Sequence, residues 1–125
     1  MSDSKTYAVN IPMYPLQIII SFDTDFELFR ERVLRQLKNL EPEELDDFEE
    51  FFQDMKDKGK TKRTTTGDVI SVFGGGNHGL IAHEVFHAAT LYMDSLGGKL
   101  VHGSEESYAY LIQYLTDAVY DIIKK

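Results

Sequence analysis

Residues 64–87 read TTTGDVISVFGGGNHGLIAHEVFH, and this stretch decides the fold. Its β-branched and aromatic segment 69–73 predicts a strand, and the Gly67-Asp68 pair predicts a turn that joins it to an earlier strand at 61–66. A glycine-rich connection follows, after which the apolar spacing predicts a helix over about residues 77–96. The stretch therefore predicts a hairpin that leads directly into a helix.

The residues before this stretch predict one more strand and two helices. Residues 14–22, YPLQIIISF, are apolar on both faces and too short for a helix, which is typical of a central strand. Thr24 and Glu27 match a capping box, so we expect a helix to begin there and to end near residue 38. Pro42 suits the first turn of a second helix.

The residues after the stretch predict one more helix. The Gly97-Gly98 pair is expected to end the helix at 77–96. Ser104 is a good N-cap for a final helix that runs to about residue 123. We therefore expect a small α+β fold of about three strands and four helices, with residues 1–125 as a single domain.

The charge of the chain is concentrated in one segment. The net charge is −8, and residues 41–57 contain nine of the 21 acidic residues but one of the 13 Lys and Arg. We expect the helix of this acidic segment to end at Gly59 and to have a solvated acidic face. Because the chain has no basic footprint, we expect no nucleic-acid binding, and the basic residues within 56–63 are expected to lie in a solvated connection.

Composition also bears on the compartment and on the type of metal site. The longest apolar run, near residues 16–22, is too short to cross a bilayer, and the first residues do not resemble a secretion signal. We therefore expect a cytoplasmic protein with no membrane partner. The chain has no cysteine, so a zinc site would have to use His and carboxylate ligands.

Gly74, Gly76 and Gly79 match the G-x-G-x-x-G pattern of dinucleotide-binding loops. That pattern needs a second parallel strand after the helix, and the sequence predicts another helix there instead. The glycines are better explained as a sharp turn between strand and helix, at φ values that other residues avoid.

His83, Glu84 and His87 match the H-E-x-x-H pattern of zinc hydrolases. On a helix, residues four apart share a face, so both imidazoles can reach one ion. Glu84 lies about 100° further round the helix, where its carboxylate can act as a general base. Apolar residues on most sides of this helix predict that it is buried, and buried polar groups need a partner such as a metal ion.

A tetrahedral zinc ion needs a third protein ligand besides two histidines and a water. The candidates downstream are His102, Glu105 and Glu106. The apolar stripe of the last helix lies nearer Glu105, whereas the face of Glu106 has two tyrosines. The two glutamates also suit the first turn of a helix as favourable charges, so the residues alone leave the ligand open.

HEVFH followed by SEESYAYLIQYL resembles the zincin metallopeptidases of the glutamate-ligand (gluzincin-like) type, and especially small versions encoded by phages and prophages. The resemblance covers about residues 69–120. It implies a zinc-binding helix packed on a short sheet and followed by a second helix that provides a ligand. It places that ligand at Glu106, with Glu105 as second choice, and implies that residues 69–73 are the edge strand along which an extended substrate lies.

The resulting hypothesis is a zinc-dependent metallopeptidase that binds one zinc ion and hydrolyses a peptide or protein substrate. Glu84 is then the general base for the attacking water. An oxyanion donor is also needed, and the candidates are Tyr108, Tyr110, His102 and His78. The alternative is a non-catalytic, zinc-stabilised binding or accessory protein of the phage type that uses the acidic helix 41–57 as its contact surface.

Overall fold

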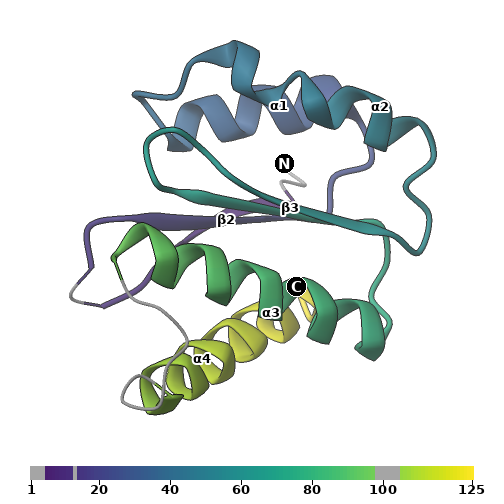
Figure 1. Cartoon of the computed structure of the whole chain (residues 1–125). Coiled ribbons are helices and arrows are strands. Elements are labelled where there is room, and N and C mark those ends of the chain that lie inside the picture. Colours follow the sequence, from purple (N-terminus) through teal and green to yellow (C-terminus); the bar gives the residue numbers. More distant parts are fainter. Residues whose placement is uncertain (1–4, 13, 98–104) are drawn as a thin grey trace.

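Helices cover both faces of a four-stranded sheet in this computed structural model, which describes residues 5–12, 14–97 and 105–125 (Figure 1). The elements in chain order are β1 (Thr6–Asn10), β2 (Gln17–Ser21), α1 (Phe26–Gln36), the 3-10 helix η1 (Pro42–Leu45), α2 (Asp47–Gln53), β3 (Gly59–Arg63), β4 (Val69–Phe73), α3 (His78–Ser95) and α4 (Glu105–Ile123). The expected α+β class is confirmed.

The strand order in the sheet is β1-β2-β4-β3. β2 and β4 pair in parallel, with Ile18 opposite Val69, and the two outer pairings are antiparallel. The prediction that residues 14–22 contain a central strand is confirmed, because β2 lies between β1 and β4. The prediction that residues 69–73 are an edge strand is wrong: β4 has a neighbour on each side, and β3 is the edge.

The sheet separates two hydrophobic cores. Alternate residues of the central strands face opposite ways, so Ile18 and Ile20 pack under α3 and α4 while Ile19 packs under α1 and α2. All three isoleucines are buried. This two-sided burial explains why strand β2 is apolar at consecutive positions.

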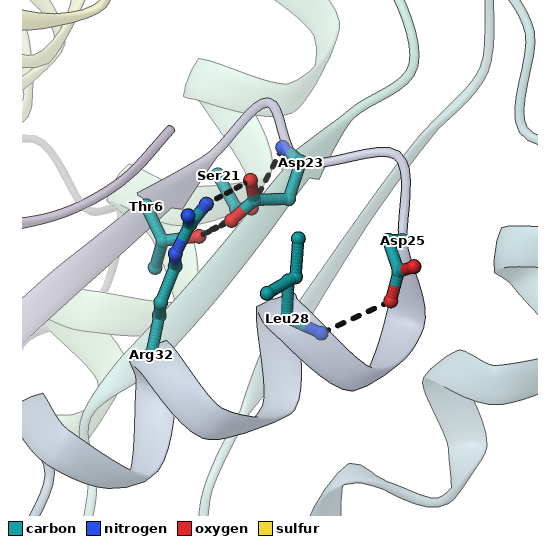
Figure 2. Close-up of polar contacts among 6 residues, drawn as sticks. All are labelled: Thr6, Ser21, Asp23, Asp25, Leu28 and Arg32. Carbon is teal, nitrogen blue, oxygen red and sulfur yellow. Dashed lines mark hydrogen bonds and ion pairs between the residues drawn. The ribbon is translucent and has the colours of Figure 1, made fainter. Parts of the chain in front are cut away.

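β1 is the strand that the sequence did not predict. Its TYAVN sequence is short and lacks strong alternation, and its place in the sheet depends on pairing with β2. Thr6 of β1 is buried and lies 2.8 Å, Oγ1 to Oγ, from Ser21, and it also donates to Asp23, as Figure 2 shows. Asp23 in turn accepts from Arg32 of α1. This polar cluster joins β1, β2 and α1 at one corner of the molecule.

The helices α1, η1 and α2, which cover one face of the sheet, do not begin and end where the sequence predicts. The N-cap of α1 is Asp25, whose side chain accepts from the Leu28 N–H at 3.1 Å, so the predicted capping box of Thr24 and Glu27 is wrong (Figure 2). α1 ends at Gln36. The predicted second helix is divided into η1 and α2, with Pro42 in the first turn as expected.

The hairpin of β3 and β4 is confirmed, but its first strand ends at Arg63 instead of residue 66, and its turn spans residues 64–68 with Gly67 at φ +94°. The prediction that Gly59 ends a helix is wrong. It is the first residue of β3, and α2 has already ended at Gln53. The loop between them brings the chain back to the sheet edge.

Crowding explains the glycine at position 74 of the glycine-rich connection, but not those at positions 76 and 79, where a Cβ would make ordinary contacts. Among the described glycines only Gly67 and Gly97 have positive φ, so the expected unusual φ at Gly74, Gly76 and Gly79 is wrong. A Cβ on Gly74 would lie 1.7 Å from the carbonyl oxygen of Met55. No strand follows α3 in the described residues, so the glycine turn does not lie within a strand-helix-strand dinucleotide unit.

Candidate metal and catalytic site

α3 begins at its N-cap Asn77, whose side chain accepts from the Leu80 N–H at 2.7 Å. This cap fixes where the helix starts and so which residues face the sheet. The buried side of α3 is formed by residues that pack on the sheet and on α4: Ile81, Glu84, Val85, Ala88, Ala89, Tyr92 and Met93. The opposite side is open to solvent, and there the expectation of a helix buried on most sides is wrong.

His83 and His87 lie on this open side, on adjacent turns of α3. Their Nε2 atoms are 3.1 Å apart. Two nitrogen ligands of one tetrahedral zinc ion, each at about 2.05 Å, would be about 3.3 Å apart. The two imidazoles therefore converge with nearly the spacing that one ion requires, while leaving other directions open to water.

Glu84 is the one charged residue on the buried side of α3, and it is 4% exposed. Its Oε1 atom accepts a hydrogen bond from Thr61 of β3 at 2.7 Å, and its Oε2 atom lies 3.8 Å from Nε2 of His83. A Cβ on Gly59 would come within 2.5 Å of Cγ of Glu84. The carboxylate is thus enclosed between the edge strand and the histidine pair.

Glu105 and Glu106 are exposed in the first turn of α4. α4 runs antiparallel to α3, because Nδ1 of His78 bonds the Tyr120 hydroxyl near the start of α3 and the end of α4 (Figure 1). Ser107 in the first turn of α4 lines a groove with Met93, which lies about 9 Å along α3 from His87 at 1.5 Å per residue.

The described residues include no group of three His, Cys, Asp or Glu side chains that could hold a metal ion. The structure brings His83 close to both His87 and Glu84, and it does not bring Glu105 or Glu106 to them. His102, the remaining candidate ligand, and the predicted cap Ser104 lie outside the described residues.

The candidate oxyanion donors have other surroundings. Tyr108 is buried in the core, and Tyr110 is 67% exposed and lines an open groove beside Met93. His78 bonds Tyr120. None of these three described side chains has a hydrogen bond to His83, Glu84 or His87.

Sequence reasoning missed Gly59, Thr61 and Ser71. Thr61 and Ser71 are directly opposite in the hairpin register, and their hydroxyl oxygens are 2.6 Å apart. Ser71 is the polar residue within the otherwise apolar VISVF, and this was the signal present in the sequence. A two-residue turn at 67–68 would have placed Ser71 opposite Thr64, so the sequence did not predict its pairing with Thr61. Two hydroxyls that face one another inside a hairpin indicate that a polar group is bound on that face of the hairpin.

The acidic segment, defined as residues 41–57, binds the hairpin through part of its carboxylates. Nζ of Lys62 lies 3.0 Å from Oδ2 of Asp47, and this hydrogen bond and charge lower the pKa of Asp47. Partial burial raises the pKa of Glu44. Hydrogen bonds from Thr65 and the charge of Lys62 together lower it by more than burial raises it, so the pKa of Glu44 is below its ordinary value. Nζ of Lys60 donates to the Asp47 carbonyl at 2.9 Å. These lysines therefore hold η1 and α2 to the sheet and are not merely a solvated connection.

Within the described part of the chain, no helix has both the length and the apolar character that a membrane span needs. The resemblance to zincins stays a prediction that depends on the residues of α3 and α4. Comparison with known proteins adds no relative, since no family model, curated protein or solved structure matches the chain.

Proposed function

We propose that this protein is a zinc-dependent hydrolase of peptide bonds, with His83 and His87 as zinc ligands and Glu84 as the general base. The observation that supports the proposal best is the convergence of two imidazole nitrogens, 3.1 Å apart, beside a buried carboxylate. H-E-x-x-H hydrolases bind zinc with two histidines on adjacent turns of a helix and use the glutamate between them as the general base.

The exposure of the histidines suits a catalytic ion better than a structural one. The side chain of His83 is 65% exposed. Structural zinc sites are closed by four protein ligands, whereas catalytic sites keep a position for water and substrate. An open histidine pair next to an enclosed carboxylate therefore favours catalysis.

The residues divide the chemistry among themselves. Bound zinc would supply Lewis-acid polarisation of the scissile carbonyl and activate a water molecule. His83 and His87 would hold the ion through Nε2. Glu84 has one oxygen bonded to Thr61, which leaves Oε2 to accept a proton from the attacking water and return it to the leaving amine.

β3 offers the substrate an edge of the sheet. It pairs with β4 on one side, and its residue Gly59 touches Glu84. An extended peptide that adds to the free side of a strand forms main-chain hydrogen bonds and passes its alternate side chains over the neighbouring helix. We assign the role of substrate-binding edge to β3 in place of residues 69–73.

Substitution of Glu84 tests the proposal directly. Glu84→Gln keeps the size of the side chain but cannot accept a proton, so it should retain one zinc ion per chain and lose hydrolysis of a peptide library by at least about a hundredfold. Zinc content is measured by elemental analysis and hydrolysis by mass spectrometry of the library.

His83→Ala is the matched control and should lose zinc and hydrolysis together. A wild-type protein without affinity for zinc would sink the proposal. A wild-type protein that binds zinc but cleaves no peptide at any pH would instead favour the non-catalytic binding alternative with the acidic segment as its contact surface.

The resemblance assigns the third ligand to Glu106, and the structure does not bring this residue to the histidine pair, so this assignment needs a test of its own. Glu106→Gln should weaken zinc affinity by about tenfold or more, because one of three protein ligands loses its charge. Glu105→Gln is the matched control, one residue away and equally exposed, and should bind zinc as the wild type does. Equal affinities for both variants, measured by competition with a chelating dye, would remove Glu106 from the ligand set.

A further inference from the structure

Two hydroxyl side chains stand behind Glu84 on the hairpin. Thr61 donates from Oγ1 to Oε1 of Glu84, and Oγ1 of Thr61 also lies 2.6 Å from Oγ of Ser71. A hydroxyl has one hydrogen to donate, and that of Thr61 is used on Glu84. Ser71 must therefore be the donor to Thr61, so the three side chains form a chain of hydrogen bonds that ends on the carboxylate.

This chain of hydrogen bonds accounts for polar residues in an apolar setting. Ser71 is 1% exposed and lies on central strand β4, on the side of the sheet covered by α3 and α4. Burying a hydroxyl or a carboxylate without a partner in an apolar medium is unfavourable. Here each hydroxyl bonds the next group, and bonds to an ionised carboxylate are stronger than neutral ones.

We propose that Thr61 is a positioning residue for Glu84, supported from behind by Ser71. Thr61 fixes Oε1, and as a result Oε2 is turned toward the histidine pair, 3.8 Å from Nε2 of His83. The inference rests on the proposed function, since it concerns how the general base is oriented.

Gly59 completes the arrangement on the same strand. It lies two residues before Thr61, and the carboxylate side chain occupies the space that a Cβ would fill, with Cδ of Glu84 only 2.6 Å from that point. β3 therefore holds Glu84 in two ways, by a hydrogen bond from Thr61 and by close packing at Gly59.

The first test compares variants of the zinc-loaded full chain on labelled casein. Thr61→Val removes the hydroxyl but keeps the shape, and it should lower kcat by about tenfold or more with KM and zinc content unchanged. Thr61→Ser should restore most of the rate, and Gly59→Ala should lower kcat with the hydroxyl intact. Thr116→Val, which removes a hydroxyl bonded within α4, is the matched control and should have no effect. A Thr61→Val enzyme with wild-type kcat would overturn the proposal.

The second test needs no activity and separates this inference from the proposed function. Thr61→Val, Glu84→Ala and the double variant of the metal-free chain are compared by their urea midpoints. Thr61→Val should lower the midpoint by clearly more when Glu84 is present than in the Glu84→Ala background, where only the bond from Ser71 is lost. A wild type that cleaves no casein counts against the proposed function, and the cycle then decides the role of Thr61: additive shifts would overturn it.

Discussion

Glu84 and its two histidine neighbours illustrate how one helical turn separates burial from exposure. Glu84 lies about 100° round the helix from His83 and so points under β3, while His83 and His87 point outward. The spacing of H-E-x-x-H predicts this division between ligands and base. It does not predict what encloses the base, because Gly59, Thr61 and Ser71 come from strands whose packing on α3 is tertiary.

Thr90, one turn beyond His87 on α3, allows a test of a buried polar atom. Its Oγ1 atom is buried without a hydrogen-bond partner among the described residues. Thr90→Val replaces the hydroxyl with a methyl group of similar size, so it should raise the free energy of unfolding by about 1 kcal/mol in urea denaturation. Thr90→Ala, which also removes packing, should not be stabilising. A destabilised Thr90→Val would mean that the hydroxyl is paired in solution.

At the scale of elements, local signals predicted most of the fold. The central β2 strand, the hairpin at Gly67, and the helix that starts after Asn77 were all predicted from the sequence near them. β1 was missed because its short TYAVN sequence lacks strong alternation, and its place depends on pairing with β2 and on the polar cluster around Asp23. The edge strand was assigned wrongly because strand order is set by the parallel pairing of β2 with β4.

The N-terminus of α1 allows a test between the predicted N-cap, Thr24, and the N-cap in the structure, Asp25. Asp25→Ala removes the side chain that accepts from Leu28, and it should lower the free energy of unfolding by about 1 kcal/mol. Thr24→Ala removes the cap that the sequence predicted and should change it by less than about 0.5 kcal/mol. Thermal or urea unfolding of both variants checks the difference. The reverse order of effects would place the cap at Thr24.

At the scale of the whole molecule, the sheet separates two cores and the charge is uneven. The layer of α1, η1 and α2 contains the acidic segment (Figure 1). Lys60 and Lys62 of β3 reach toward it. The net charge of −8 therefore overstates the negative charge that this face presents to solvent, because some of its carboxylates are paired with lysines. Part of the negative charge serves to attach a helical layer to the sheet edge that also holds Glu84.

This attachment predicts a pH dependence. Lys62 lowers the pKa of Asp47 in the folded protein, so the contact adds its full stability above the ordinary pKa of 3.8 and loses it as the pH falls through the lowered value. Between about pH 5 and pH 2 the urea midpoint of Lys62→Met should therefore fall less steeply than that of the wild type. Lys124→Met, which removes a positive charge at the C-terminus, is the control. Parallel slopes for Lys62→Met and wild type would exclude this contact as a source of acid sensitivity.

The order of elements along the chain also has a consequence for how the molecule is made. The parallel partner of β2 comes 51 residues later in the sequence, since Ile18 pairs with Val69. Gly59, Thr61, Ser71, Glu84 and both histidines, by contrast, lie in one continuous segment. During synthesis from the N-terminus, we expect the hairpin and α3 to emerge together and to close β2 into the sheet in the same step. Completion of the sheet and assembly of this part of the candidate site are then expected to be one folding event.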